Sequence, residues 1–182
     1  MFKAFCGIDP GLTGAVACVD CEGSVQIWDT PTLKFEKRTK AKTGHRTEYD
    51  VPAMVDLLVK IRKAFWTLDV LNDPVAIVIE RQQAMPKDMR GTIGAFSSGW
   101  GFGLWVGVMT ALGMRHELIR PSEWKPVLMK GLPKEKDASR MRACQIFPNA
   151  VELLGRKKDH GRAEALLLAE WGRRLYAPTG AY

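Results

Sequence analysis

Short apolar runs alternate with longer amphipathic stretches along most of the chain. Residues 3–8 and 75–79 are almost continuously apolar, which is typical of strands buried on both faces. From residue 50 to about residue 66, apolar side chains recur every three or four positions, which predicts a helix capped by Asp50. The whole pattern predicts strands at Lys3–Ile8, Ala15–Val19 and Ser24–Thr30, a helix from Asp50 to about Trp66, a strand ending at Glu80, a helix from about Gly99 to Gly113, a strand at Arg115–Ile119, a short helix from Pro121 through Lys125, a helix from Asp137 or Ser139 to about Phe147, and a last helix from about Gly161 to Leu175.

The order of these elements indicates the class of fold. Three strands joined by short turns come first, and strands then alternate with helices. Such alternation favours parallel pairing in the second half, so we expect an α/β fold with a mixed five-stranded sheet flanked by helices. Two segments lack a clear pattern. Pro31–Tyr49 is rich in basic residues and is predicted to be a loop or an extended arm, whereas Gln82–Ser98 is polar and contains glycine.

Size and composition predict one ordinary globular domain that spans residues 1–182. The chain is 46% hydrophobic and 26% charged, and it is long enough to bury a stable core without disulfides or structural metals. No run of about 18 apolar residues occurs, so we expect no transmembrane span and no membrane partner.

Met1 is followed almost directly by the first predicted strand, which leaves no room for a targeting segment and favours bacterial or phage cytoplasm. The alternative is the plastid stroma after removal of a transit peptide.

The net charge of +7 predicts a polyanionic partner, because each Lys or Arg that neutralises a phosphate releases counterions. Positive charge gathers in two clusters, which are Lys34, Lys37, Arg38, Lys40, Lys42 and Arg46, and then Arg156, Lys157, Lys158 and Arg162. The second cluster surrounds Asp159, so it places positive charge beside one of the candidate acids described next.

The four cysteines, Cys6, Cys18, Cys21 and Cys144, suggest a reducing compartment. Cys18 and Cys21 have the spacing of a redox or zinc half-site, but no second ligand pair with zinc spacing accompanies them. We therefore interpret the cysteines as small core or turn residues rather than as a functional site.

Four acidic residues stand at the ends of buried elements, where a charge kept only for solubility is not expected. Asp9 and Glu80 close the two apolar runs, and side chains at the carboxyl ends of such strands project beyond the apolar layer. Glu164 shares a helical face with leucines of the last predicted helix, where an unpaired carboxylate would be costly. Asp159 precedes that helix and can reach the same space.

Four carboxylates in one place need a counter-charge, since each like-charged pair at about 4 Å costs roughly 4 kcal/mol at an effective dielectric of 20. Oxygen-only ligands select hard ions such as Mg²⁺ or Mn²⁺, and two ions roughly 4 Å apart can promote an in-line displacement at phosphorus. The acids together predict a two-metal phosphodiesterase centre. Taken singly, Asp9 could belong only to a turn, Asp159 could cap the helix, and Glu80 could pair with a neighbouring arginine, Arg81 or Arg90.

Three motifs carry a resemblance to a known family, namely GIDPG at residues 7–11, VIER at 78–81 and KKDHGRAEAL at 157–166. With AMP at 84–86, GFGL at 101–104 and the Trp124-Lys125 pair, they resemble the RuvC family of Holliday junction resolvases. Within it they are most similar to the branch of the monokaryotic chloroplast resolvase and its bacterial and phage relatives. The resemblance covers nearly the whole chain. Bacterial RuvC has its last two acids three residues apart, whereas Gly161 takes that position here.

The resemblance implies a ribonuclease H-like fold, a homodimer and magnesium-dependent paired nicking of four-way DNA junctions. It implies that Asp9, Glu80, Asp159 and Glu164 are catalytic metal ligands. His160 would assist leaving-group protonation or bind metal, and the alternative is a structural histidine.

The resemblance also places several basic and polar residues near the junction. The predicted DNA-binding residues are Gln82, Gln83, Met85, Lys87, Arg90, Lys125, Lys130, Lys134, Lys136, Arg140, Lys157 and Lys158. The lysines would track phosphates, whereas the loop after Glu80 would enter the junction centre, where Met85 could wedge between bases.

Gly99, Gly103 and Gly107 recur every four residues in the helix predicted from about residue 99. Glycine costs about 1 kcal/mol relative to alanine in a helix, so the stripe requires a reason such as close backbone approach. One interpretation is tight packing on the chain's own sheet. The other is a symmetric dimer seam flanked by Trp100 and Trp105.

Two other functions remain open from the residues. One is an actin-like or sugar-kinase ATPase domain, because Asp9-x-Gly-x-Thr-Gly resembles the phosphate-binding turn of that superfamily, although 182 residues leave little space for a second lobe. The other is a catalytically silent junction-binding protein, against which the intact acids argue. We predict a junction endonuclease that uses no nucleotide cofactor.

Overall fold

The computed structural model describes residues 2–38, 43–65, 74–82, 91–133, 135 and 137–176. The strands are β1 (Ala4–Asp9), β2 (Ala15–Asp20), β3 (Val25–Asp29), β4 (Thr32–Arg38), β5 (Thr43–Tyr49), β6 (Val75–Glu80) and β7 (His116–Ile119). The helices are α1 (Val51–Phe65), α2 (Gly91–Ala111), α3 (Pro121–Leu128), α4 (Ala138–Ile146) and α5 (His160–Tyr176), with short helices η1 (Pro148–Ala150) and η2 (Glu152–Leu154). None of the described helices combines the length and the apolarity that a membrane span requires.

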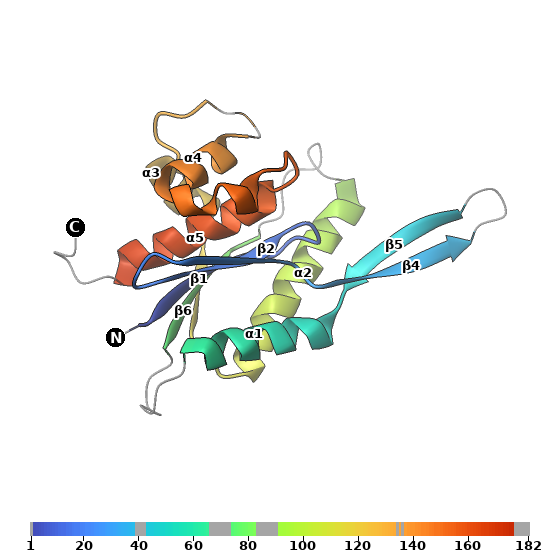
Figure 1. Cartoon of the computed structure of the whole chain (residues 1–182). Coiled ribbons are helices and arrows are strands. Elements are labelled where there is room, and N and C mark those ends of the chain that lie inside the picture. The colour runs from blue at the N-terminus through green and yellow to red at the C-terminus, as the bar shows by residue number, and fades with distance from the viewer. Residues whose placement is uncertain are drawn as a thin grey trace.

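The main sheet has five strands in the order β3-β2-β1-β6-β7. β1 is antiparallel to β2 and parallel to β6, and β6 is parallel to β7. The mixed five-stranded sheet predicted from the sequence is therefore confirmed. Helices cover both faces, and a two-stranded arm made of β4 and β5 extends away from this body (Figure 1).

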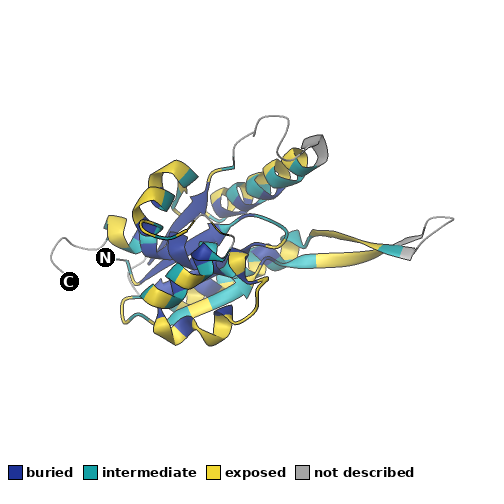
Figure 2. Cartoon of the chain, turned by 90° about the horizontal axis from the view of Figure 1, so that it is seen from above, coloured by how far each residue is buried: buried dark blue, intermediate teal, exposed yellow. Residues whose placement is uncertain are grey.

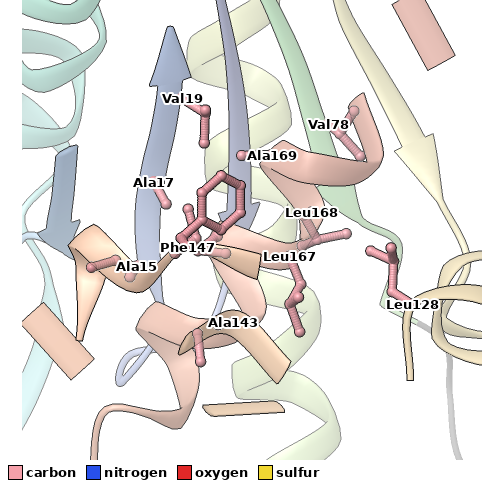
Figure 3. Packing of buried hydrophobic residues seen from close by; sticks show 14 of the residues in the cluster. Ala15, Ala17, Val19, Val78, Leu128, Ala143, Phe147, Leu167, Leu168 and Ala169 are labelled. Carbon is pink, nitrogen blue, oxygen red and sulfur yellow. The ribbon is translucent and has the colours of Figure 1, made fainter. Parts of the chain in front are cut away.

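One face of the sheet is covered by α5, which packs against β1, β2 and β6. Its outer side is covered by α3 and α4, so Leu166, Leu167 and Leu168 are all fully buried. Figure 3 shows Leu167 and Leu168 in the cluster that also contains Phe147 and the alanines Ala15 and Ala17 of β2. A helix that is buried on several sides is fixed firmly in place, and α5 carries Glu164 and begins directly after Asp159.

The opposite face of the sheet packs against α1 and α2. Met54, Leu58 and Ile61 form the buried stripe of α1, as its spacing predicts, and Asp50 Oδ1 accepts a hydrogen bond from Ala53 N at 3.1 Å at the start of the helix. From α2, Trp105 is fully buried in the same core.

The helix α2 starts at Gly91 rather than near Gly99, so the prediction of a polar, non-helical segment is wrong from residue 91 onward. Threonine, serine and glycine lower the intrinsic helix propensity of this stretch, but propensity predicts helices only weakly.

The segment from Pro31 to Tyr49 is also more regular than a loop, because it contains β4 and β5.

The arm pairs β4 with β5 without a break from Thr32 opposite Tyr49 to Arg38 opposite Thr43. Of the two interpretations of this segment, the extended arm is confirmed and the loop is wrong. Its apolar side chains have little core to enter, since Leu33 is 44% and Phe35 is 43% exposed. The guanidinium of Arg46 lies over the Phe35 ring, 5.8 Å from its centroid. Figure 2 shows that most of the described arm is exposed.

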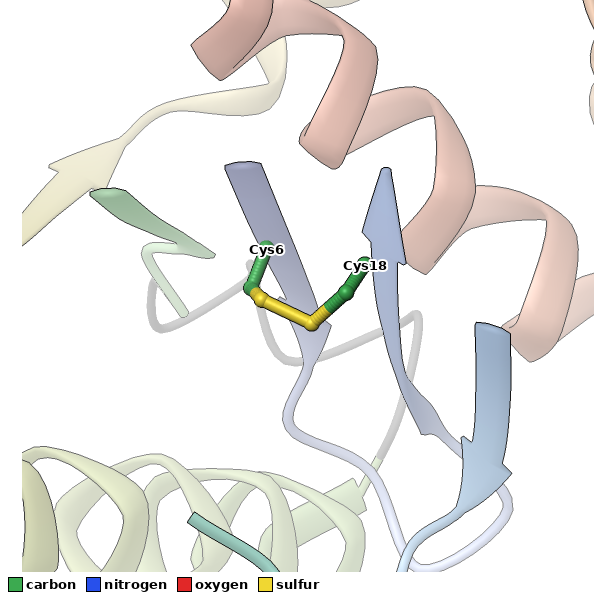
Figure 4. The surroundings of a disulfide bond; sticks show 2 residues. All are labelled: Cys6 and Cys18. Atoms are coloured by element: carbon green, nitrogen blue, oxygen red, sulfur yellow. A yellow bond between two sulfur atoms is a disulfide. The ribbon is translucent and has the colours of Figure 1, made fainter. Parts of the chain in front are cut away.

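Cys6 and Cys18 form a disulfide between β1 and β2 (Figure 4). Both cysteines are buried in the core, as predicted, but their pairing was not predicted. The antiparallel register places them directly opposite each other on one face of the sheet, a proximity that their separation of 12 positions does not reveal. The nearby Cys21 is free and hydrogen-bonds to the carbonyls of Phe2 and Lys3, so the Cys18 and Cys21 spacing forms no shared site.

Candidate active site

Three acidic side chains from separate elements meet beside one lysine. Asp9 ends β1, and Glu80 ends the parallel neighbour β6, so both emerge at the same edge of the sheet. Glu164 comes from the second turn of α5, which crosses β1. The Lys125 ammonium nitrogen lies 3.3 Å from Glu164 Oε1 and 3.6 Å from Glu80 Oε2. We call Asp9, Glu80 and Glu164 the acidic cluster.

Buried donors hold two members of the acidic cluster. The indole Nε1 of Trp124, a fully buried residue of α3, donates to Glu80 Oε2 at 3.0 Å. The hydroxyl of Ser139, in α4, donates to Glu164 Oε1 at 3.2 Å. Hydrogen bonds from fixed donors orient a carboxylate and favour its ionised form. The sequence reasoning gave neither donor a role, and only the Trp124-Lys125 pair in a motif could have drawn attention to one of them.

Two glycines allow the backbone of α5 to lie directly on β1 and on the turn that follows it. A Cβ atom at Gly7 would collide with the backbone of α5 at Ala165, and a Cβ atom at Gly161 would collide with the Thr13 carbonyl. The latter Cβ atom would also lie only 3.1 Å from Asp9 Oδ2. Glycine is thus required at these positions to bring α5, and with it Glu164, close to Asp9.

Tyr49 links the arm to the turn after Asp9. Its hydroxyl, at the end of β5, donates to the Pro10 carbonyl at 3.2 Å. A Cβ atom at Gly101 would collide with this hydroxyl, so α2 also lies against Tyr49. Burial, followed by the charge of Asp9, raises the pKa of Tyr49 to about 12, so the hydroxyl remains protonated and able to donate.

The electrostatics of the acidic cluster show an excess of negative charge. Burial, followed by the Glu164 and Glu80 carboxylates, raises the pKa of Asp9 from 3.8 to about 7. Burial also raises the pKa of Glu80, although the Lys125 charge and the Trp124 hydrogen bond oppose that shift. One ammonium group therefore does not balance the three carboxylates. The cluster favours uptake of a proton or of a further cation.

The fourth predicted acid, Asp159, is buried but is engaged elsewhere. Arg156 donates its backbone N to Asp159 Oδ2 at 2.8 Å and its guanidinium to Oδ1 at 2.8 Å. Burial opposes ionisation of Asp159, but these bonds outweigh it and keep the pKa of the carboxyl below its ordinary value. The exposed His160 follows at the start of α5. Asp159 and His160 line a neighbouring cavity, so the structure groups three of the four acids and pairs the fourth with Arg156.

The donor set of the acidic cluster fits a hard divalent cation. Its side chains offer only carboxylate oxygens, and the raised pKa of Asp9 marks negative charge that Lys125 leaves uncompensated. In the described ranges, however, no group of three or more His, Cys, Asp or Glu side chains is close enough to form a ready-made cation site. The Lys125 ammonium contacts two of the three carboxylates directly.

The predicted DNA-contacting residues occupy different settings. Lys130, Lys157 and Lys158 are exposed. Lys125 contacts two carboxylates of the acidic cluster. Arg140 is instead bonded to Asp137 at 2.7 Å and to the Leu154 carbonyl at 3.0 Å, so its guanidinium braces α4. Gln82 is partly exposed just after β6. Six other predicted contacts lie outside the described residues, namely Gln83, Met85, Lys87, Arg90, Lys134 and Lys136.

The glycine stripe of α2 does not pack on the chain's own sheet. A Cβ atom at Gly99, Gly103 or Gly107 would meet no other described part of the chain within 4 Å, so the interpretation as internal close packing is wrong. Trp100 is 57% exposed beside the stripe, whereas Trp105 is fully buried in the core and is unavailable to a partner. The two tryptophans differ in exposure because an α-helix has 3.6 residues per turn. Residues five positions apart therefore lie on different faces, and Trp105 is on the face of α2 that meets the sheet.

No protein-family model matches the chain. Its sequence is 32% identical over 161 residues, 86% of the chain, to the Chlamydomonas reinhardtii protein named Holliday junction resolvase MOC1, chloroplastic. The chain spans only 18% of that relative's length. Its structure is similar to T. thermophilus RuvC, solved in complex with Holliday junction substrate, with a TM-score of 0.54, 19% identity and coverage of 97% of this chain and 96% of that chain. The predicted resemblance to RuvC-type resolvases and the ribonuclease H-like fold are confirmed.

Proposed function

We propose that this chain, a ribonuclease H-like domain similar in sequence to a junction resolvase, is a metal-dependent endonuclease that resolves four-way DNA junctions by paired symmetric nicks. The observation that carries the proposal is the convergence of Asp9, Glu80 and Glu164 at one edge of the sheet. The sequence similarity to a protein named as a Holliday junction resolvase supports the same substrate. The proposal concerns the domain described here, since the relative is much longer.

The acidic cluster is proposed to bind Mg²⁺ or Mn²⁺, with two ions per site and with Asp159 as a candidate fourth ligand. Bound ions would supply activation of a water and stabilisation of the leaving oxygen at phosphorus. The chain's own residues then have positioning tasks. Trp124 orients Glu80, and Ser139 orients Glu164. The exposure of His160 favours contact with bound DNA over a structural role.

Lys125 is proposed to act in two states of the site. Without divalent ions its ammonium group holds Glu80 and Glu164 together against their mutual repulsion. It also lines an open cavity of about 680 Å³ with Lys130 and Ser139, beside Glu164. This cavity is the proposed path of the scissile strand, and Lys125 would turn from the carboxylates toward its phosphates.

The assembly is proposed to be a homodimer. Two nicks related by two-fold symmetry require two active sites in a fixed arrangement, which a symmetric dimer supplies. The open glycine stripe and the exposed Trp100 on α2 provide a surface on which a second helix can lie closely. Phe96, 72% exposed, stacks on Trp100 and extends this surface.

The proposal is tested by incubating the protein with an immobile four-way junction, with and without magnesium. We expect symmetric, ligatable nicks only when the ion is present. Asp9→Asn and Glu80→Gln should abolish cleavage and retain junction binding, because they remove a ligand charge but little volume. Glu22→Gln, an exposed change in the turn between β2 and β3, is the matched control and should cleave normally. Full cleavage by both site variants would refute the assignment.

The same experiment separates the two other functions. A catalytically silent junction-binding protein would bind the junction in every buffer but leave it intact. An actin-like ATPase would bind ATP, which titration calorimetry would detect and which we do not expect. The acidic cluster favours the nuclease over a silent binding protein, because binding alone does not require three carboxylates in one place.

A further inference from the structure

A second cavity, of about 360 Å³, lies between the base of the arm and the start of α5. It is a neighbour of the acidic cluster, because Gly161 at the start of α5 lies beside Asp9 while the turn Leu12–Gly14 lines the cavity. Its polar lining includes Thr30, Lys34, Thr47, Arg156, Lys158 and Asp159. The function proposed above assigns no role to Thr30, Lys34 or Thr47.

The charged residues that line this cavity leave an excess of positive charge. Arg156 is paired with Asp159, and Arg162 is paired with Asp29 at 2.5 Å. The lining holds two more cations, Lys34 and Lys158, and neither forms an ion pair with a described residue. Four cations thus face two carboxylates, a difference of +2 with histidine neutral. An anion of low charge is the ligand that this balance favours.

A buried hydroxyl group gives independent support for a ligand. Thr30 is only 4% exposed, and its Oγ1 has no hydrogen-bond partner in the described part of the chain. Leaving such a buried group unsatisfied is unfavourable, because it has lost its hydrogen bonds to water. The backbone of Thr30 is held in place, since its N donates to the Gly14 carbonyl at 3.0 Å. An acceptor oxygen from a bound anion would satisfy the hydroxyl.

The N-terminus of α5 also favours an anion in this cavity. The first turn of this 17-residue helix contains no acidic residue, and the preceding Asp159 is neutralised by Arg156. Free backbone N–H groups and the helix dipole favour an anion at such a terminus.

We propose that this cavity binds a phosphodiester group of the DNA strand that runs past the acidic cluster, so that the base of the arm is part of the DNA-binding surface. The proposal rests on the function proposed above. Lys34 from β4 and Lys158 from the segment before α5 would neutralise the phosphate from two sides, and Thr30 would donate to it. A free phosphate ion shares this chemistry, but it would not need an opening beside the acidic cluster.

The test measures junction binding by fluorescence anisotropy in EDTA, where no cleavage occurs, over a salt series from roughly 50 to 200 mM. Lys34→Ala and Lys158→Ala should each make the slope of log K against log salt shallower by about 0.9, the value for one lost phosphate contact. A fourfold rise in salt would then weaken binding by about 3.5-fold less than in the wild type. Thr30→Val should weaken binding without changing the slope, because the hydroxyl is neutral.

Lys60→Ala is the matched control, because Lys60 is exposed on α1, on the opposite face of the sheet. Its slope should equal that of the wild type. The proposal is overturned if Lys34→Ala and Lys158→Ala also keep the wild-type slope. These lysines are exposed, so their variants remain informative even if Thr30→Val does not fold.

Titration with inorganic phosphate separates the two sources of the ligand. Saturable phosphate binding that is lost in Lys34→Ala, together with an unchanged DNA slope, would show a free-anion site and overturn the proposal. Wild-type cleavage with an unchanged slope refutes only this inference. A changed slope without any cleavage in magnesium refutes the proposed nuclease function and leaves the phosphate subsite intact.

Discussion

Replacing Asp9 with asparagine should stabilise the protein in metal-free buffer at pH 8. Burial and the neighbouring Glu164 and Glu80 raise the pKa of Asp9 from 3.8 to about 7 in the folded state. The folded protein therefore binds a proton at Asp9 that the unfolded chain, with a carboxyl pKa of about 3.9, has already released. The neutral Asp9 carboxyl therefore costs the folded protein nothing below about pH 4. As the pH rises from 4 toward 7, the free energy of unfolding of the wild type falls, because the folded state increasingly carries an unfavourable charge at Asp9.

The size of the effect follows from the shift in pKa. A difference of roughly 3 units at about 1.36 kcal/mol each gives a ceiling of about 4 kcal/mol. Water entry and side-chain movement reduce the cost of a buried charge, so we expect a gain of about 1–3 kcal/mol for Asp9→Asn above pH 7. Asparagine keeps an oxygen that can accept the hydrogen bond from the Gly11 backbone, so the turn itself should be preserved.

Urea unfolding in EDTA at a series of pH values measures this gain. The difference between Asp9→Asn and the wild type should be near zero at pH 4 and should reach its plateau above pH 7. Asp56→Asn, an exposed change on α1, is the control and should show no such trend. Magnesium at pH 8 should stabilise the wild type more than Asp9→Asn, because a ligand that binds only the folded state adds to its stability. A variant that is equal to or less stable than the wild type at pH 8 would contradict the reasoning.

Three further changes test the framework around the cluster. Gly7→Ala should destabilise the fold by about 3 kcal/mol or more, measured by urea unfolding, because its methyl group would push α5 off β1. Trp124→Phe removes the donor that favours ionised Glu80, so it should raise the pKa of that carboxyl and shift the acidic limb of the cleavage pH profile to higher pH; an unshifted profile would contradict this role. A reducing agent should lower the free energy of unfolding by about 3 kcal/mol because it breaks the Cys6–Cys18 disulfide, and Cys18→Ser should remove that sensitivity.

Much of the framework of the fold could be predicted from local pattern. The runs that became β1 and β6 are apolar throughout, which indicates strands covered on both sides, and their terminal acids stand out against that background. The helix α5 was recognisable because its apolar spacing is regular. The start of α2 was missed, since serine, threonine and glycine weaken the local signal there without preventing a helix.

Contacts between distant elements could not be predicted in this way. Nothing local indicates that the Lys125 ammonium would lie between Glu80 and Glu164, which are 45 and 39 positions away from it in the chain. The Cys6–Cys18 pair likewise depends on the register of β1 and β2.

The amino-acid sequence by itself determined which segments are buried and which acids end them, because buried elements show a regular pattern of apolar residues along the chain. Its net charge predicts a polyanionic partner. The tertiary structure alone decided which of those acids share one space and which cavities lie beside them. That depends on where α5 crosses β1, a contact that joins residues more than a hundred positions apart, and on how the arm's two strands pair. The physical reason is that hydrophobic burial constrains which face of a helix or strand a residue occupies. Contacts between side chains depend in addition on the register of paired strands and on the angle at which helices cross the sheet.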